Sequence, residues 1–151
     1  AEVQRTIADI ADPYHLRFSP DMQWLVTASN RLDRVDIYRW HGLGTAASAP
    51  AAQPLVLVAR LPAPKTPSHL AIDSRSRTVY VSLQDSDELL AVDLATQKPR
   101  WKVPVGRMPA DVYLAPDDRI DEILDMPLLA SHLEAGLAAF DYSCEGVGQN
   151  D

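Results

Sequence analysis

Pro109-Ala-Asp-Val-Tyr-Leu-Ala-Pro-Asp117 decides the fold, because the same pattern stands twice more upstream. The earlier copies are Pro13-Tyr-His-Leu-Arg-Phe-Ser-Pro-Asp21 and Pro67-Ser-His-Leu-Ala-Ile-Asp-Ser-Arg75. Each copy begins with a proline, carries an aliphatic residue three positions later and an apolar residue five positions later, and continues into a turn. Apolar residues at every second position are typical of a half-buried strand. A proline can be the first residue of such a strand, because its missing N–H is tolerated at that position. The chain is therefore predicted to be a repeat protein built from short strands.

The agreement between the first two copies extends beyond the proline-led strand. An apolar run begins at the same distance from the proline in both copies, as Trp24-Leu-Val-Thr-Ala28 and Thr78-Val-Tyr-Val-Ser82. An aspartate also follows at one shared distance, Asp33 after Pro13 and Asp87 after Pro67, and precedes a third apolar run. We therefore expect each copy to form a unit of three strands joined by tight turns.

The spacing of the repeats indicates a propeller. The interval from Pro13 to Pro67 is longer than the interval from Pro67 to Pro109, and a segment rich in Ala, Ser and Pro, 43–54, has the length of the difference. Without this insertion the period is about 42 residues, which is the length of a four-stranded blade. Leu55 to Leu61 and Arg100 to Val105 are then the outer strands of two blades. The predicted fold class is all-β, with antiparallel blades of an incomplete β-propeller at residues 1–119.

Over residues 3–119 the chain resembles the YVTN group of β-propeller repeat proteins. The matching segments are Pro13–Asp21, Thr78–Ser82, Leu89–Thr96 and Val103–Pro109. The resemblance implies a propeller fold and is unspecific for function, since the family includes secreted, surface-layer and periplasmic proteins. It is also similar to lactonase-like and haem d1-binding propellers. The chain departs from the family in length, because a propeller usually has at least four blades and this stretch supplies two and one opening strand.

After Arg119 the strand pattern gives way to helical spacing. Apolar residues then recur every three or four positions, at Met126, Leu129, Leu133, Leu137 and Phe140. Asp125 can cap such a helix, and Pro127 stands where a first turn accepts proline. We expect residues 120–151 to form a helical tail that covers exposed blade surface or contacts another chain. A changed reading frame after Arg119 is the remaining explanation.

Composition excludes some classes of function. A net charge of −7 and a pI near 4.9 argue against a nucleic-acid-binding protein, which needs clustered Lys and Arg. No apolar run approaches the roughly 18 to 20 residues that span a bilayer. The single cysteine, Cys144, excludes an internal disulfide. The start at Ala1-Glu2 fits removal of an export signal, which predicts a periplasmic or secreted protein, and trimming of a longer sequence explains it as well.

The candidate site residues are His15, His69 and Asp111, because each stands two positions after its proline. In a propeller they would lie at equivalent points of neighbouring inner strands, near the mouth of the channel. Two imidazoles and a carboxylate suit zinc, copper or iron, so a transition-metal site is one interpretation. The other is that the histidine makes a local hydrogen bond that closes the blade turn. The resemblance to haem d1-binding propellers adds haem as a candidate cofactor.

The sequence contains no catalytic motif. The segment Asp85-Ser-Asp87-Glu88 lacks the glycine and the distal glutamate of a calcium loop, so a hairpin turn is expected there.

The sequence predicts a non-enzymatic binding or scaffold module that presents blade loops to a protein or a small ligand. The alternative is a metal- or haem-dependent or lactonase-like enzyme with its site on the channel rim. Because two blades leave apolar faces uncovered, we also expect self-association or docking on another protein subunit.

Overall fold

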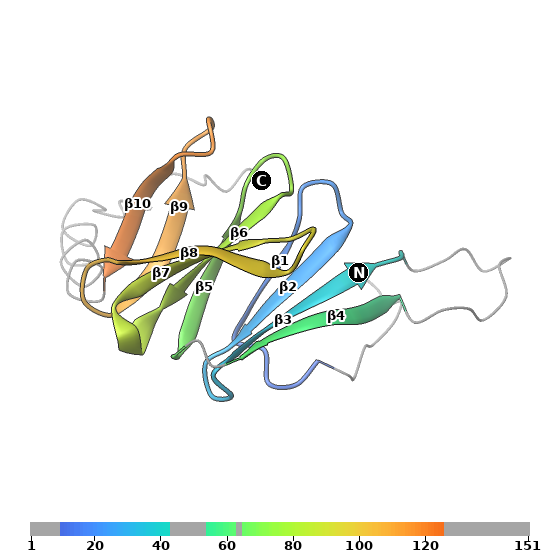
Figure 1. Ribbon diagram of the computed structural model, residues 1–151, viewed down its shortest axis with the longest axis horizontal. Coiled ribbons are helices and arrows are strands. Elements are labelled where there is room, and N and C mark those ends of the chain that lie inside the picture. The colour runs from blue at the N-terminus through green and yellow to red at the C-terminus, as the bar shows by residue number, and fades with distance from the viewer. Residues whose placement is uncertain (1–9, 43–53, 63–64, 126–151) are drawn as a thin grey trace, which may run out of the picture.

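The computed structural model describes residues 10–42, 54–62 and 65–125, which form three antiparallel sheets (Figure 1). The first sheet contains β1 (His15–Phe18), β2 (Trp24–Ser29), β3 (Arg34–Trp40) and β4 (Leu55–Pro62). The second contains β5 (Pro67–Ile72), β6 (Thr78–Leu83), β7 (Glu88–Asp93) and β8 (Lys98–Pro104). The third contains β9 (Pro109–Leu114) and β10 (Ile120–Asp125).

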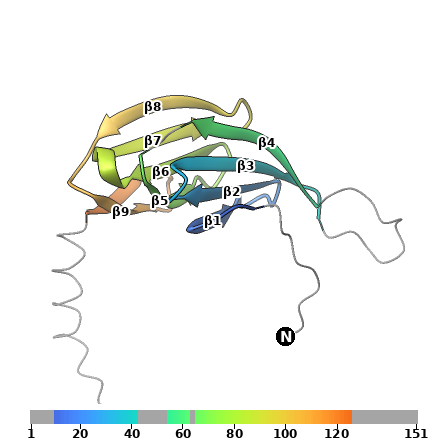
Figure 2. The same ribbon diagram turned by 90° about the horizontal axis from the view of Figure 1, so that it is seen from below.

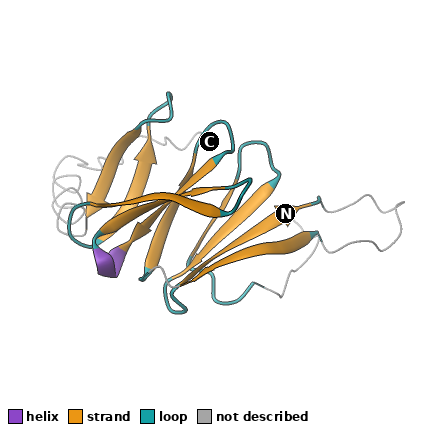
Figure 3. Cartoon of the chain, viewed as in Figure 1, coloured by secondary structure: helices purple, strands orange, loops and turns teal. Residues whose placement is uncertain are grey.

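Each four-stranded sheet is one propeller blade, as the period of the repeats predicts. Its strands pair in the order of the chain, β1-β2-β3-β4 and β5-β6-β7-β8, so a tight turn can connect most neighbours (Figure 3). The middle strands are buried on both faces, which explains their continuous apolar sequences. In Figure 2 the inner strands β1 and β9 lie along one side of the molecule and the outer strands β4 and β8 along the other.

The hydrophobic core lies between the blades rather than within one sheet. Between the first and second blades it consists of aliphatic side chains from both, Val26, Ala28, Val35, Ile37 and Leu61 facing Leu70, Val79, Val81, Leu83, Leu90, Val92 and Leu94. A smaller cluster, Ala71, Leu89 and Val112, joins the second blade to the third sheet. Packing of one blade against the next therefore holds the inner strands side by side.

The three proline-led segments share a backbone conformation as well as a sequence pattern. Two positions, the residue before the proline and the ninth residue after it, have a positive φ in all three copies although none is glycine. The φ values are 45°, 45° and 49° at Asp12, Thr66 and Met108, and 57°, 57° and 65° at Met22, Ser76 and Asp118. Such residues are held in the left-handed region against a steric cost. The segments are therefore geometrically equivalent, and each belongs to a different sheet.

The outer strands agree with the sequence prediction and share one irregularity. The register of β4 shifts between the partners of Ile37 and Tyr38, and that of β8 shifts between the partners of Ala91 and Val92, which are the equivalent positions. A bulge twists a strand and interrupts its edge. Both blades therefore carry the same protection against pairing through their outer edges.

The structure differs from the sequence prediction at residues 120–125, which form β10 rather than the start of a helical tail. This strand pairs antiparallel with β9, placing Ile123 opposite Val112. Register shifts on both sides of the pairing break the alternation of apolar residues, which is why the strand was not visible in the sequence. The predicted helix from Met126 onward and residues 43–53 of the insertion lie outside the described residues. Within the described ranges, no helix is both long and apolar enough to cross a membrane.

Candidate functional site

The structure brings His15, His69 and Asp111 together on the neighbouring inner strands β1, β5 and β9. The imidazole rings of His15 and His69 are stacked, with centroids 3.8 Å apart and planes inclined by 17°. Nδ1 of His69 forms an ion pair or hydrogen bond with Oδ1 of Asp111. All three side chains are partly buried, and their strands are the innermost strands of the three sheets.

His15 forms a hydrogen bond between two blades. Its Nδ1 accepts the backbone N–H of Leu70 at 3.1 Å, and Nε of Arg17 donates to the carbonyl of Leu70 at 3.3 Å. His15 and Arg17 of β1 thus bind both backbone polar groups of Leu70 in β5, whose side chain is fully buried. The interpretation of a local bond closing the blade's own turn was therefore wrong in one respect, because the bond crosses to the next blade.

At the interface between the second blade and the third sheet, the backbone N–H equivalent to that of Leu70 has a different acceptor. Val112 is the equivalent of Leu70, and its N–H donates to Oδ1 of Asp111 at 2.7 Å. That oxygen is also the one paired with His69, so His69 reaches the third sheet through Asp111 rather than directly. The repeated histidine thus has a structural role at both interfaces.

Both histidines are neutral near pH 7. Burial, together with the charges of His69 and Arg17, lowers the pKa of His15 to about 4. Burial also lowers the pKa of His69, and the neighbouring Asp111 carboxylate opposes that shift. A neutral His15 that accepts at Nδ1 carries its proton at Nε2. A neutral His69 with its proton on Nδ1, the nitrogen beside Asp111, leaves Nε2 as a proton acceptor, which is the arrangement of a general base.

The geometry of the three residues suits a hydrogen-bonded row better than a metal centre. Stacked, nearly parallel rings hold their nitrogen lone pairs in separate planes, whereas metal ligands point to a common centre. Among residues 10–42, 54–62 and 65–125, no group of three or more His, Cys, Asp or Glu side chains is arranged to hold a metal ion. Asp87 of the expected hairpin turn instead accepts the N–H of Met108 at 2.7 Å.

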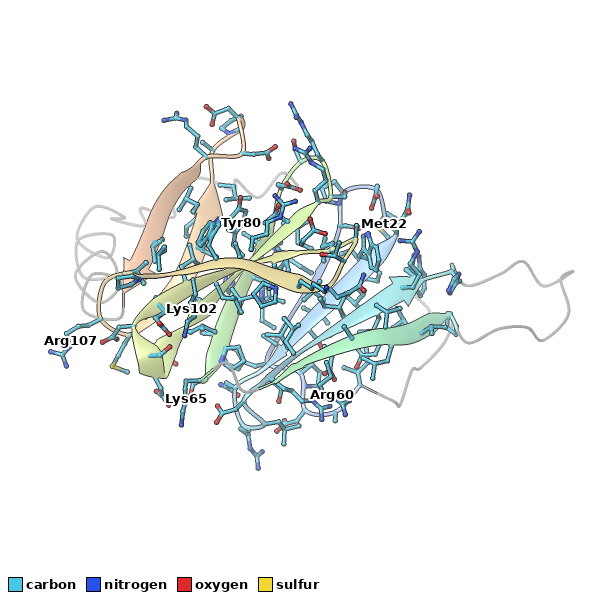
Figure 4. The ribbon with its side chains drawn as sticks, viewed as in Figure 1. Met22, Arg60, Lys65, Tyr80, Lys102 and Arg107 are labelled. Carbon is cyan, nitrogen blue, oxygen red and sulfur yellow. The ribbon has the colours of Figure 1, made fainter. Side chains whose placement is uncertain are left out.

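A second candidate site is a groove of about 680 Å³ between β4 of the first blade and β7 and β8 of the second. We call it the inter-blade groove. Its floor is the outer end of the inter-blade core, Leu61, Leu83 and Leu90. Trp101 and four basic side chains, Arg60, Lys65, Arg100 and Lys102, line its walls with Glu88. Figure 4 shows Lys65 and Lys102 on the second blade's side and Arg60 on the first blade's side.

The inter-blade groove carries an excess of positive charge. Asp36 is buried and pairs with both Arg34 at 3.0 Å and Arg60 at 2.9 Å, so two guanidinium groups share one carboxylate. Lys102 pairs with Glu88, and Arg100 pairs with Asp93, which balances those two charges. No acidic side chain of the described residues forms an ion pair with Lys65. The groove therefore favours a negatively charged ligand.

The inter-blade groove was not predicted from the sequence because its walls come from two repeats. Arg60 and Lys102 stand in outer strands that face solvent, and each in isolation resembles an ordinary solvated strand residue. A further hollow of about 350 Å³ crosses the inner strands and is lined by Arg17, Phe18, Pro20, Ala71, Ile72, Val112, Tyr113 and Leu114. Arg17, Ala71 and Val112 of its lining follow His15, His69 and Asp111 closely in the same three strands.

Solved structures with similar folds are propellers or proteins that contain them. Hydrazine synthase from Kuenenia stuttgartiensis superposes with a TM-score of 0.61 and 18% identity, over 84% of this chain and 37% of that one. A proposed 6-phosphogluconolactonase from Bacteroides uniformis gives 0.57 and 15%, over 77% and 34%. The Cps50 (Swd1) β-propeller domain from Myceliophteria thermophila gives 0.53 and 14%, over 68% and 31%. At these identities the likeness shows the fold alone.

The chain spans about a third of the length of these solved structures. A search of curated protein sequences finds no significant match. The sequence profile of the YNCE-like beta-propellers matches residues 1–129, which is most of the chain and includes all three sheets. The repeat pattern, the two four-stranded blades and this match lead to one conclusion: the chain belongs to the YNCE-like β-propeller family.

Proposed function

We propose that the chain is a non-enzymatic binding module and that the inter-blade groove is its ligand site. The observation that supports this proposal is the combination of an apolar floor with an unbalanced set of basic side chains. The groove volume of about 680 Å³ lies in the range of roughly 300–1,000 Å³ that is usual for ligand sites. The ligand is a short peptide segment or small molecule that carries apolar groups and carboxylates.

The chemistry of the walls sets the expected behaviour of binding. Trp101 is 38% exposed and offers a flat apolar surface, and Lys65 is an exposed residue of the groove lining. Salt screens charges at exposed sites over about 10 Å at 0.1 M, so affinity should fall as the salt concentration rises. Burial of apolar groups against Leu61, Leu83 and Leu90 should persist at high salt.

A labelled peptide tests the proposal. The probe is a fluorescein-labelled peptide of leucine, phenylalanine, aspartate and glutamate, and the matched control has lysine in place of the acidic residues. We expect fluorescence anisotropy to show binding of the acidic probe alone, weaker at 0.5 M salt than at 0.05 M. Lys65→Glu should reduce affinity about tenfold, whereas Lys98→Glu, on the same blade but outside the groove, should not. Equal binding of both peptides, or an unchanged affinity in Lys65→Glu, would overturn the proposal.

The second candidate function is catalysis on the channel side, and the observation that favours it is the pair of His69 and Asp111. A neutral imidazole held by a carboxylate can accept a proton from water, which is the step that lactone hydrolysis needs. Hydrolysis of a lactone that is lost in His69→Gln and kept in Lys65→Glu would support it. The transition metal or haem expected from the sequence stays a prediction, which elemental analysis and an absorption spectrum of the purified protein test.

We also propose that the first blade is covered by a second copy of the chain. Leu16 stands at the position of Leu70 and Val112, which are 0% and 2% exposed because a preceding blade covers them, and yet Leu16 is 48% exposed. Because the equivalent aliphatic side chain is buried in the other two copies, the exposed Leu16 indicates a contact surface on the first blade.

A further inference from the structure

We infer that the inter-blade groove is occupied by an acidic segment of the chain itself, residues 126–151, which we call the acidic tail. The inference rests on the proposed function of the groove and names its first ligand. It predicts that any external ligand binds by displacing this segment.

The charges of the chain are divided sharply along its length. Residues 1–119 contain 14 Lys or Arg and 14 Asp or Glu, so they carry no net charge. Residues 120–151 contain seven Asp or Glu and no Lys or Arg, so they carry the entire net charge of −7. Four of the seven acidic residues lie in the acidic tail, Glu134, Asp141, Glu145 and Asp151. The excess positive charge of the groove and the negative charge of the tail are therefore complementary.

The acidic tail also supplies the apolar groups that the floor of the groove requires. Its sequence places Leu129, Leu133, Leu137 and Phe140 at intervals of three or four residues, interspersed with the acidic positions. These are the two kinds of group that Leu61, Leu83, Trp101, Arg60 and Lys65 present from the other side. Complementarity of both kinds favours this segment over a ligand that is only charged or only apolar.

The tail is long enough to reach the groove. It starts after Asp125, the last residue of β10, and runs to Asp151. This length spans roughly 40 Å as a continuous helix and about 85 Å when extended. A domain of this size has a radius of gyration of about 14 Å. A tethered segment also acts at an effective concentration on the order of millimolar, so even a weak contact is largely formed.

Cys144, the only cysteine of the chain, provides a test without any substitution, because it lies in the acidic tail. A nitroxide attached to Cys144 broadens the amide signals of nearby residues in a ¹⁵N correlation spectrum of the full chain. We expect broadening at Leu61, Trp101 and Lys102 in the groove and none at Asp21 and Met22 in the turn after β1. Reduction of the nitroxide gives the reference spectrum.

A charge-neutral tail in the full chain provides the second measurement. The variant Glu134→Gln, Asp141→Asn, Glu145→Gln should lose most of the broadening and should bind the acidic fluorescein peptide at least threefold more tightly, since its own tail competes less. A spin-labelled chain mixed with an unlabelled ¹⁵N chain should show no broadening at the groove. Broadening in that mixture would overturn occupancy by the same chain.

The outcomes separate this inference from the proposed function. If the acidic peptide binds at the groove and Cys144 broadens nothing there, the tail is not the occupant and the binding function stands. If neither the peptide nor the tail reaches the groove, both ideas fail together. Broadening at the groove that persists in the charge-neutral variant, with unchanged peptide affinity, also overturns the inference, because charge would then have no part in it.

Discussion

The carboxylate of Asp33 accepts the backbone N–H of Thr66 at 2.8 Å and so connects the β2–β3 turn of the first blade to the segment that opens the second. Asp87 makes the equivalent bond to Met108 at 2.7 Å. Both acceptor residues, Asp33 and Asp87, and both donor residues, Thr66 and Met108, have a positive φ between 45° and 54°. The backbone before Pro67 and before Pro109 is thus held in an unfavourable conformation by the preceding blade.

Asp33→Ala should reduce the free energy of unfolding by about 1–2 kcal/mol, because it removes the acceptor for a partly buried N–H and places alanine in the left-handed region. Asp33→Asn keeps an acceptor oxygen and should cost less than about 0.5 kcal/mol. Urea unfolding measures both. Similar losses in the two variants would mean that the bond contributes little.

Stability should fall between pH 6.5 and pH 4, because the pKa of His15 is lowered from 6.5 to about 4 in the folded protein. In this range the unfolded chain binds the proton and the folded chain does not, so the unfolded state is stabilised relative to the folded state as the pH drops. The ring is only partly buried, so water screens the effect and we expect a loss of about 1 kcal/mol. The loss is complete near pH 4 and absent above pH 7.

The matched variant for that measurement is His15→Gln, which does not titrate. Urea unfolding at pH 7.5, 5.5 and 4 should show a flatter pH dependence for this variant than for the wild type. An identical slope in both proteins would assign the pH dependence to other groups.

Asp36 should be far more sensitive to substitution than a surface carboxylate. It is 2% exposed and accepts the Tyr38 hydroxyl at 3.2 Å in addition to its two arginine partners. Asp36→Ala leaves Arg34 partly buried without its counter-ion and should cost about 2–4 kcal/mol. The exposed pair of Asp117 and Arg119 is the control, and Asp117→Ala should cost less than about 0.5 kcal/mol. Thermal or urea unfolding of both variants is the measurement.

The third sheet should open before the blades as the pH falls. Asp118 accepts both the N–H and the hydroxyl of Ser74, at 2.6 and 2.7 Å, and the N–H bond lowers the pKa of Asp118 below 3.8. A lowered carboxyl pKa contributes stability above that value and loses it on protonation. Between pH 6 and pH 3, the protection factors for hydrogen exchange should therefore fall more in β9 and β10 than in β6 and β7. In Asp118→Ala the same difference should already be present at pH 6.

Light scattering should show that the chain self-associates and that Leu16→Glu does not, because a charge at the centre of an apolar contact surface is costly to bury. The control is Val103→Glu on the outer strand β8, where Val103 is 40% exposed and no blade is expected to pack. Equal masses for the wild type and Leu16→Glu would contradict the proposed contact.

The sequence predicted the blades well because propeller repeats leave local signals. Each of these signals can be recognised within a short stretch of the chain. They are the proline at the start of each inner strand, the aspartate at the turn and the insertion at 43–54. Even the meeting of His15 with His69 follows from their equal distance to a proline. Such features depend on short-range turn chemistry, which a single sequence contains.

What the sequence could not show depends on contacts between repeats. His15 accepts the N–H of Leu70 in the next blade, and no sequence pattern around either residue predicts that hydrogen bond. The inter-blade groove likewise combines Arg60 with Lys102. The strand β10 was missed for a different reason, since its bulges disturb the period that would identify it.

Three of the bonds described here have one direction: His15, Asp33 and Asp87 accept, and Leu70, Thr66 and Met108, each in or at the start of the following unit, donate. A ribosome releases the accepting side of each pair first. Each completed unit therefore already presents these acceptors when the following unit leaves the ribosome, and the following unit can pack against it at once. Other contacts run the opposite way, from Arg17 to the Leu70 carbonyl and from Ser74 to Asp118, so these three acceptors set only part of the order in which each interface forms.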